Sequence, residues 1–310
     1  MFSGASNFTD NVDRTFMFTF YVSMFFLVGV TIVMLYFVYK YHKKRRPKSE
    51  HIEGNVLLEV IWTVIPVILV GFMFVFGWTN WKRMKSPPKN AFLIKSTARM
   101  WSWSFEYPNG KVTDTLYVPQ HKPVKVDVTS ADVIHSMYIP AFRLKQDMVL
   151  GSTNFVWFVA EKTGIYNLFC AEYCGLRHSY MTTAVVVMPD KEFNSWYNDT
   201  SQVKAAPGKD KAASPGQQLV LKNGCIACHS IDGSQIVGPS FKGIYGEKTT
   251  VTANGKEQQV TVDDAYILES LMEPNAKVVK GFQSGLMQPY KGTISNEQAK
   301  QIADYIKSLK

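Results

Sequence analysis

The sequence has little excess charge outside its first ninety residues. Over all 310 residues, 34 basic and 25 acidic side chains leave a net charge of +9. Residues 1–90 carry 11 basic and 5 acidic groups, whereas residues 91–190, 191–214 and 215–310 are each only +1. A nucleic-acid surface requires Lys and Arg clustered on the folded part of the chain. The distribution therefore argues against nucleic acid as a partner.

Histidine and cysteine are also scarce, with six and four residues respectively. His42, His51 and His121 are scattered along the chain. The sequence therefore has no histidine-rich catalytic cluster. Four cysteines outside the cytosol would ordinarily predict two disulfides, but their spacing favours metal and cofactor sites, as described below.

Charge is absent from two long stretches, Thr15 to Tyr39 and Val60 to Trp81, which contain 25 and 22 residues. A bilayer core requires roughly 20 helical residues, so each stretch is long enough to cross it. A signal peptide does not fit the first stretch, because the apolar part is too long and no small-residue cleavage site follows. We therefore expect residues 1–90 to form a transmembrane hairpin, with helices at about 15–39 and 60–81.

The loop between these stretches is strongly basic, whereas only Arg14 flanks the other end of the first stretch. The positive-inside rule places this loop in the cytoplasm and both chain termini outside. Basic residues at 82–89 oppose that orientation, but charges before a long translocated domain weigh less. Trp78 and Trp81 lie where an outer aromatic belt is expected. The basic loop residues are Lys40, Lys43, Lys44, Arg45, Arg46 and Lys48.

Residues 91–190 have the pattern of a β domain. Val124, Val126 and Val128 alternate with polar residues, and three valines at 185–187 precede Met188-Pro189. Short strands with turn signals and no long helical pattern are typical of a Greek-key sandwich or barrel.

Two thiols, an imidazole and a thioether fall within twelve residues, at Cys170, Cys174, His178 and Met181. A second imidazole, His135, follows the valine-rich strand after a Ser-Ala-Asp turn. Soft sulfur ligands with imidazole favour copper or zinc. A blue-copper site needs only one thiolate, so the extra cysteine favours two copper ions bridged by both thiolates. A zinc site and a Cys170–Cys174 disulfide remain the alternatives, although zinc does not explain Met181.

The motif Cys-x-Glu-x-Cys-x3-His-x2-Met resembles the CuA motif of cytochrome c oxidase subunit II, a family with a two-helix anchor and a cupredoxin domain. The resemblance implies that Cys170 and Cys174 bridge two coppers, with His135 and His178 as terminal ligands and Met181 as the thioether ligand. It also implies two roles for Glu172. Its backbone carbonyl would bind copper, and its carboxylate would reach a magnesium ion shared with the main subunit.

The same resemblance implies functional roles for Trp101 and Glu59. Residues 101–107 alternate aromatic and polar side chains, which by itself predicts a buried strand face. The family position matching Trp101 is the residue at which electrons enter near CuA. Glu59 precedes an apolar helix, where the helix dipole favours a carboxylate. In the family, a Glu before an Ile-Trp-Thr-x-Ile-Pro stretch lies at the mouth of a proton pathway, and residues 59–66 fit that pattern.

Residues 191–214 predict a linker, since positions 200–216 are small, polar and rich in Pro and Gly. Ser214 is a candidate helix N-cap before Pro215. Cys225-Ile226-Ala227-Cys228-His229 then matches the c-type haem attachment signature. The two thiols add to the haem vinyl groups, and His229 becomes an iron ligand.

A class I cytochrome c requires a second axial ligand and a closing helix, which we expect within residues 215–310. Met287 follows His229 by 58 residues, whereas Met272 lies in an amphipathic helical pattern that indicates a core position. Gly238-Pro239 resembles the loop that supports the proximal histidine in this family. Ser295 and Gln298 predict a capping box before a helix with one apolar face. The Met-Gln-Pro sequence departs from the Met-Pro of many relatives.

Together these features resemble subunit II of a haem–copper terminal oxidase with a fused cytochrome c domain, of the caa3 type. The expected fold is multidomain: a transmembrane hairpin, an all-β cupredoxin-like domain and an all-α class I cytochrome c domain. The resemblance implies an electron-transfer subunit that does not reduce O2 alone. Its partners would be subunit I, other oxidase subunits, membrane lipid, and cytochrome c or another upstream donor. The expected location is the bacterial plasma membrane, with both redox domains outside.

Two rival functions remain open. One is the CuA subunit of a nitric oxide reductase. The other is a membrane-tethered copper and haem carrier with no catalytic partner. A nitrous oxide reductase is disfavoured, because its catalytic copper cluster needs many histidines.

Overall fold

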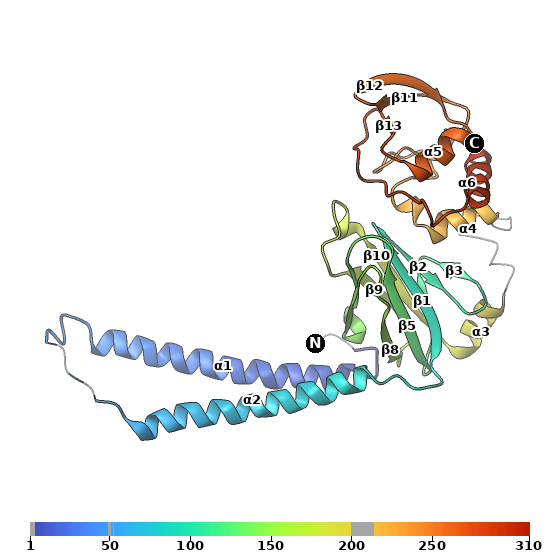
Figure 1. The fold of residues 1–310 in the computed structure, drawn as a ribbon. Coiled ribbons are helices and arrows are strands. Elements are labelled where there is room, and N and C mark those ends of the chain that lie inside the picture. The colour runs from blue at the N-terminus through green and yellow to red at the C-terminus, as the bar shows by residue number, and fades with distance from the viewer. Residues whose placement is uncertain (1–3, 49–50, 52, 200–213) are drawn as a thin grey trace. The chain divides into compact units, whose positions relative to one another are not determined.

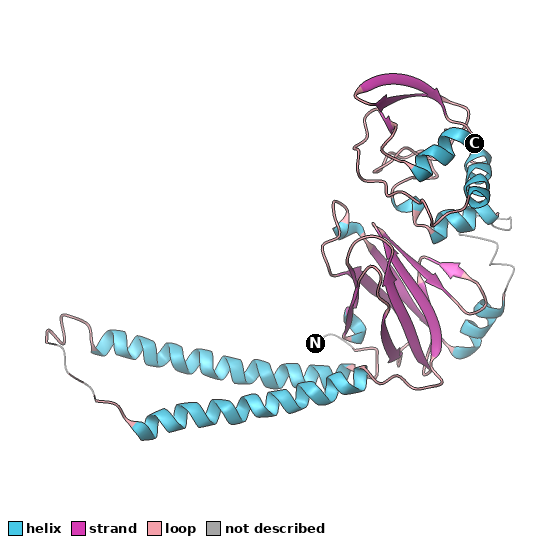
Figure 2. Cartoon of the chain, viewed as in Figure 1, coloured by secondary structure: helices cyan, strands magenta, loops and turns pink. Residues whose placement is uncertain are grey.

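The computed structural model describes residues 4–48, 51, 53–199 and 214–310. Most of the expected linker, residues 200–213, lies outside the described residues. The chain divides into two compact units, Asn7–Pro87 and Met1–Ser6 with Pro88–Lys310. Figure 2 shows one unit built of helices alone, and strands concentrated in the other.

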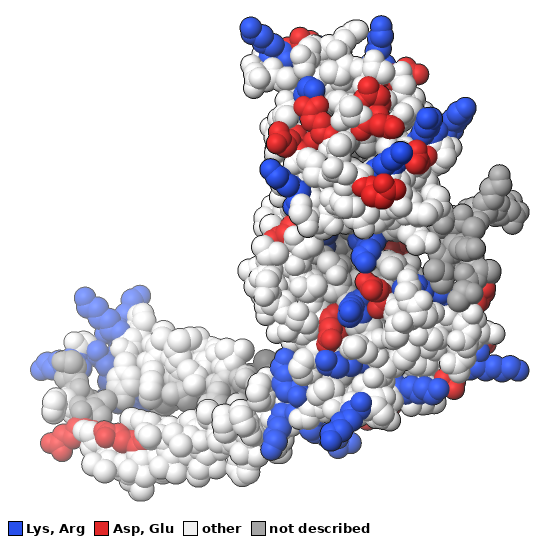
Figure 3. All heavy atoms as spheres, turned by 45° about the vertical axis from the view of Figure 1, so that its right-hand side comes forward, with Lys and Arg blue, Asp and Glu red and all other residues white. Residues whose placement is uncertain are grey.

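The smaller unit is a pair of long helices, α1 (Thr9–Lys40) and α2 (Val56–Met84). Both are longer than the expected 15–39 and 60–81, because helical structure continues into the polar residues that flank each apolar stretch. Each contains an apolar window long enough to cross a membrane, and no residue of that window is buried. Figure 3 shows this hairpin largely free of charge along its length, with Lys and Arg gathered at its loop. Apolar side chains exposed in this way are suited to lipid.

Helix α2 begins with a recognisable capping residue, and a polar contact joins α2 to α1. The Asn55 side chain caps α2 by accepting a hydrogen bond from the Leu58 amide. Glu59 lies in the first turn of α2, as expected for a carboxylate at a helix start. Near the other end of the hairpin, the amide of Asn80 donates to Thr15 Oγ1 at 2.8 Å. This polar contact fixes the two helices against each other, which lie side by side in Figure 1.

Residues 92–188 form two five-stranded sheets, with strand orders β3-β2-β1-β5-β8 and β4-β10-β9-β6-β7. The first sheet comprises β1 (Phe92–Arg99), β2 (Ser102–Glu106), β3 (Val112–Thr113), β5 (Pro123–Ser130) and β8 (Asn154–Val159). The second comprises β4 (Leu116–Pro119), β6 (His135–Ile139), β7 (Leu144–Met148), β9 (Gly164–Cys170) and β10 (Thr182–Met188). Sequence neighbours are often separated within the sheets, and β1 pairs with β5 in parallel, so the chain crosses between strands as a Greek-key sandwich does.

The predicted alternation is confirmed in the core of this sandwich. Val124, Val126 and Val128 of β5 are fully buried, while the intervening residues are partly exposed. The aromatic stretch likewise buries Trp103 and Phe105 on one face of β2. A short helix, α3 (Asp190–Asn198), follows the last strand.

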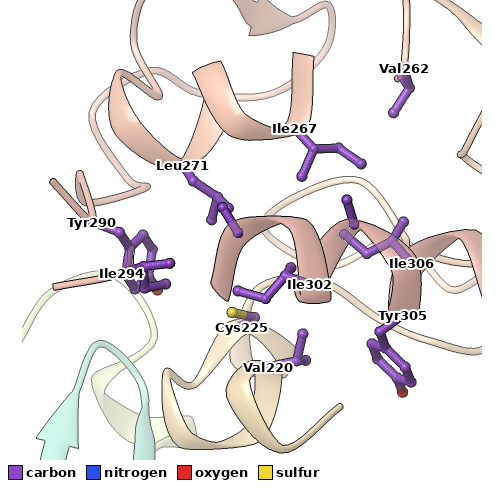
Figure 4. Packing of buried hydrophobic residues seen from close by; sticks show 12 residues of the cluster. Val220, Cys225, Val262, Ile267, Leu271, Tyr290, Ile294, Ile302, Tyr305 and Ile306 are labelled. Carbon is purple, nitrogen blue, oxygen red and sulfur yellow. The ribbon is translucent and has the colours of Figure 1, made fainter. Parts of the chain in front are cut away.

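Residues 215–310 form a helical domain with α4 (Pro215–Lys222), α5 (Asp264–Met272) and α6 (Asn296–Ser308). The expected caps are confirmed: Ser214 accepts from the Gln217 amide, and Ser295 with Gln298 forms a capping box. Helices α4 and α6 approach closely at Gly216, where a Cβ atom would lie 1.9 Å from the Gln301 carbonyl oxygen. Figure 4 shows residues of these helices, including Val220 and Ile302, packed around Cys225.

This domain also contains a three-stranded sheet, ordered β12-β11-β13, which was not expected from the sequence. Its strands are β11 (Lys248–Ala253), β12 (Lys256–Thr261) and β13 (Val278–Val279). The signal for the hairpin was present, because Asn254-Gly255 connects β11 to β12 and both residues have positive φ angles, 49° and 74°. The strands are polar and mostly exposed, so they lack the apolar alternation that marks a buried sheet.

Candidate copper and haem centres

Strand pairing brings the candidate copper ligands together at one end of the sandwich. Cys170 ends β9, and His135 begins β6, the strand next to it. The antiparallel pairing of β9 with β10 places Met181 beside Cys170, whose amide donates to the Met181 carbonyl at 3.1 Å. Cys174 and His178 lie in the loop between these strands, with His178 in a 3-10 turn (His178–Tyr180). Residues separated by up to 46 positions thus form one cluster.

Each thiol of this cluster has its own imidazole neighbour. Cys170 Sγ lies 3.9 Å from His135 Nδ1, and Cys174 Sγ lies 3.5 Å from His178 Nδ1. The two sulfur atoms are 3.8 Å apart, beyond the roughly 2.05 Å of a disulfide bond, and both cysteines are free. The carbonyl oxygen of Glu172 lies 3.2 Å from Cys170 Sγ, and Met181 Sδ lies 3.7 Å from Cys174 Sγ. The arrangement is symmetric in its donors, with one thiol, one imidazole and one further donor on each side.

The pKa values of the two thiols shift in opposite directions, which is consistent with a site that binds metal cations. A hydrogen bond from Cys174 lowers the pKa of Cys170 well below its usual range. The same contact raises the pKa of Cys174, because a second thiolate 3.8 Å from the first would be repelled. Both side chains are buried, so water cannot screen that repulsion effectively. Metal ions between them would allow both to ionise, which is the donor chemistry of a copper site.

Asp132 orients His135, a role that the sequence analysis missed. Its Oδ1 atom lies 2.8 Å from His135 Nε2, which leaves Nδ1 directed at Cys170. Although burial opposes ionisation, hydrogen bonds from His135 and the amides of Met100 and Val133 keep the pKa of Asp132 low. Burial is the largest single effect on the pKa of His135 and lowers it, but the hydrogen bonds and charges of Asp132 and Cys170 together outweigh burial and raise the pKa. Asp-x-x-His spacing was the available signal, since a carboxylate commonly supports a metal-binding histidine from this kind of position.

Trp101 contacts the copper-ligand loop directly. It is nearly buried, and its indole Nε1 donates to the Cys174 carbonyl at 3.1 Å. Trp103, two residues later, donates to the Met181 carbonyl at 3.4 Å. The aromatic stretch is therefore both a buried strand face and a support for two of the candidate ligands.

The haem attachment motif begins immediately after α4. The helix ends at Lys222, two residues before Gly224 with its φ of +67°, and Cys225–Ala227 form a 3-10 turn. The two thiols, the imidazole and the candidate sulfur ligand all line one cavity whose other walls are largely apolar. Burial raises the pKa of Cys225 and of Cys228 to about 11. Four cofactor-binding side chains around one apolar cavity fit a covalently attached haem. These four are Cys225, Cys228, His229 and Met287.

His229 is held in the orientation that an axial ligand requires. Its Nδ1 donates to the carbonyl of Pro239 at 2.8 Å, which leaves Nε2 free to bind a metal. Its ring stacks on Phe241 at 4.6 Å, and a Cβ atom on Gly238 would lie only 2.6 Å from His229 Cε1. Burial lowers the pKa of His229, which favours the neutral, iron-binding imidazole. Gly238 and Pro239 thus support the imidazole.

The remaining candidates occupy different places. Met287 lines the haem cavity, and Met272, at the end of α5, is not among its lining residues. The Glu172 side chain is exposed. Glu59 lies in the helical hairpin, the other compact unit.

A membrane-anchored chain with a sulfur–imidazole metal site and a c-type haem cavity belongs to the class of electron-transfer proteins. Comparisons with known proteins agree over three separate stretches. The family model for the cytochrome c oxidase subunit II transmembrane domain matches residues 1–79, and that for its periplasmic domain matches residues 110–188. The cytochrome c model matches residues 213–310.

Named relatives agree with these matches. Cytochrome c oxidase subunit 2 of Alkalihalophilus pseudofirmus is 27% identical over 297 residues, covering 92% of this chain and 83% of the relative. The protein of the same name from Cereibacter sphaeroides is 30% identical over 209 residues, covering 54% of this chain and 69% of the relative. The crystal structure of the periplasmic domain of subunit II of cytochrome oxidase from Bradyrhizobium japonicum is 38% identical. It covers 36% of this chain and 94% of that one, with a TM-score of 0.34.

The chain belongs to the cytochrome c oxidase subunit II family and carries a cytochrome c domain after its copper-binding domain. Membership implies a copper site in the sandwich and haem c in the helical domain, and the donor sets described above fit both groups.

Proposed function

We propose that this chain is the electron-transfer subunit of a membrane haem–copper terminal oxidase. Electrons are accepted at haem c and passed to a dinuclear CuA centre. They continue to a separate catalytic subunit, where O2 is reduced and protons are translocated. The observation that carries this proposal is the pair of buried thiols 3.8 Å apart, each beside a different histidine.

Two copper ions account for this donor set better than one metal ion. A mononuclear blue-copper site uses a single thiolate, so it would leave either Cys170 or Cys174 without a role. A tetrahedral zinc site would use both thiols and both imidazoles but leave Met181 unexplained, although its sulfur lies 3.7 Å from Cys174 Sγ. With two ions, the copper-holding residues are His135, Cys170, Glu172 through its carbonyl, Cys174, His178 and Met181.

The surrounding residues keep the centre rigid and dry. When bound, the copper pair supplies one-electron redox chemistry. Asp132 fixes the orientation of His135, and Trp101 and Trp103 hold the ligand loop through its carbonyl groups. His135, Met181 and the two cysteines are buried, so most of the copper-holding side chains are removed from water, while His178 is partly exposed. Fixed ligands and excluded water suit a site that must change oxidation state without changing shape.

The copper-ligand loop also presents the surface on which we place the catalytic subunit. Tyr173, Leu176 and Tyr180 are all exposed, although each is large and apolar. They lie between or beside the copper ligands, where a partner could cover them and accept electrons. The exposed Glu172 carboxylate lies on the same loop and would reach a magnesium ion at that interface. Glu59, in the first turn of α2, would lie at the mouth of a proton pathway into the same partner.

The anchor determines the location of these domains. With the basic loop in the cytoplasm, both redox domains face the periplasmic or extracellular side of a bacterial plasma membrane. The apolar faces of α1 and α2 contact lipid or other oxidase subunits. The upstream donor is cytochrome c or another external reductant that meets the haem.

Purification of the intact membrane complex tests this function. We expect two coppers per c-type haem iron contributed by this chain, a large polytopic haem-containing subunit, and oxygen uptake driven by reduced cytochrome c. A complex that reduces nitric oxide but not oxygen would identify a nitric oxide reductase instead. Isolation without a catalytic subunit would identify a tethered carrier. One copper per chain, or zinc, would exclude the dinuclear centre.

A further inference from the structure

One arginine of the copper-ligand loop reaches the haem attachment loop, Cys225–His229. The sandwich and the helical domain belong to the same compact unit. Arg177 lies between the copper-holding residues Cys174 and His178, and its guanidinium donates to the carbonyl of Ala227 at 2.5 Å. Ala227 is in the middle of the attachment motif. This contact therefore joins the copper-ligand loop to the haem loop directly.

A second arginine, at the end of β1, extends into the haem cavity itself. The Arg99 guanidinium carbon lies 4.6 Å from the centre of the Tyr290 ring. Tyr290 is buried in the helical domain and donates to the Asn223 carbonyl at 3.1 Å. Arg99 and Met100 both line the cavity that holds the haem-binding side chains. The copper-binding sandwich thus supplies part of the wall of the haem cavity.

The two surfaces also fit closely at the backbone. Gly224, immediately before the attachment motif, packs on Ser102, and a Cβ atom at Gly224 would lie 2.0 Å from Ser102 Oγ. Two residues earlier, Lys222 forms an ion pair of 3.4 Å with Glu106 of β2. Contacts of three kinds, namely hydrogen bonding, close packing and charge pairing, therefore involve the same short segment of the helical domain.

Hydrogen bonds connect the residues that follow Arg99 to two of the copper-holding residues, His135 and Cys174. The Met100 amide donates to Asp132 at 2.8 Å, and the same carboxylate orients His135. Trp101, the next residue, donates to the Cys174 carbonyl. The consecutive residues Arg99, Met100 and Trp101 therefore connect the haem cavity wall to two copper-holding residues.

We propose that Arg99 and Arg177 are positioning residues that seat the haem attachment loop on the copper-binding domain. The inference rests on the proposed electron-transfer function and adds which residues hold the donor and acceptor domains together. An external donor then reduces the haem, and the copper centre receives its electrons from the chain's own cytochrome domain. Residues 200–213 connect the two domains in the sequence. The contacts of Arg99 and Arg177 determine the orientation in which the cytochrome domain transfers electrons to the copper-binding domain.

Electron transfer between the two centres in the purified oxidase complex tests the role of the arginines. The haem is reduced in microseconds by a photoactivated ruthenium reagent, and its reoxidation is followed together with reduction of the copper. Losing the charged hydrogen bond of Arg177 and the cation–π contact of Arg99 lowers the ratio of seated to unseated cytochrome domain about tenfold or more, and the rate falls with the seated fraction. We expect this slowing in the double variant Arg99→Gln/Arg177→Gln, with unchanged haem absorption and copper paramagnetic resonance spectra. Arg177→Lys, which keeps the charge and a donor, should recover part of the rate.

A charge exchange provides an independent test. Lys222→Glu places two carboxylates together and should slow the transfer, whereas Lys222→Glu/Glu106→Lys should restore it. Lys256→Gln, on the β11–β12 hairpin, removes a charge elsewhere on the same domain and should leave the rate unchanged. A wild-type rate in the double arginine variant, or failure of the exchange to restore transfer, would overturn this proposal. Absence of haem-to-copper transfer in the unaltered complex would instead overturn the proposed function.

Discussion

The carboxylate of Asp132 meets the imidazole of His135 at 2.8 Å, and this contact turns the other ring nitrogen toward Cys170. A ligand thus oriented before the metal arrives loses less freedom on binding. The contact is buried, so solvent does not weaken it.

Asp132→Asn should weaken copper binding without unfolding the domain. The amide keeps the shape of the side chain but loses the charge that holds His135, and such changes typically cost about 10–100-fold in metal affinity. Competitive copper titration with a chelator of known affinity measures the effect. Asp114→Asn, at an exposed turn, is the matched control. Equal copper affinity in the two variants would contradict the orienting role.

Cys170→Ser should abolish the dinuclear centre while sparing the haem. Removing one bridging thiolate leaves the remaining donors suited to one ion, so copper should fall from two to one or none per haem. The mixed-valence copper spectrum should disappear, and the c-type haem bands should remain. Metal analysis with paramagnetic resonance checks both expectations. A retained mixed-valence signal would show that Cys170 is not a bridging ligand.

Met287→Leu should lower the reduction potential of the haem. Replacing a thioether ligand removes the donor that raises the potential of His–Met haems. We expect a fall of more than about 0.1 V, within the roughly 0.8 V range that axial ligands control. Met272→Leu, which alters the helical position outside the cavity lining, should leave the potential unchanged. A redox titration of both variants distinguishes the two methionines.

The haem-free protein should lose stability as the pH rises. Burial raises the pKa of Cys225 and Cys228 to about 11, above the value of roughly 8.5 for an exposed thiol. The unfolded chain therefore releases protons first, and stability present below about pH 8.5 declines as pH rises toward 11. Urea unfolding of the haem-free chain at pH 8 and pH 10 measures this effect. Cys225→Ala/Cys228→Ala should have a smaller dependence, and an equal dependence would exclude these thiols as its source.

Local patterns in the sequence were sufficient for much of this architecture. The charge-free stretches predicted the membrane helices, because a spanning helix is determined by its own length and apolarity. The valine alternation predicted β5, and the capping residues predicted the starts of α4 and α6. The Cys-x-x-Cys-His motif is equally local, since one short segment carries both the covalent attachment and the proximal ligand.

The tertiary structure determined which residues contact the copper and haem ligands. Asp132 is three residues from His135 in the sequence, but only the fold of its loop brings its carboxylate to the imidazole and to the Met100 amide. The hydrogen bonds of Trp101, which immediately precedes β2, and of Trp103, within β2, reach residues more than seventy positions away in the sequence. The contacts of Arg99 and Arg177 likewise depend on two separately folded domains meeting. The sequence by itself determined which groups the chain can bind, because ligand types and short spacings are local properties. Which side chains orient those groups and connect them was decided by long-range packing, which no single segment encodes.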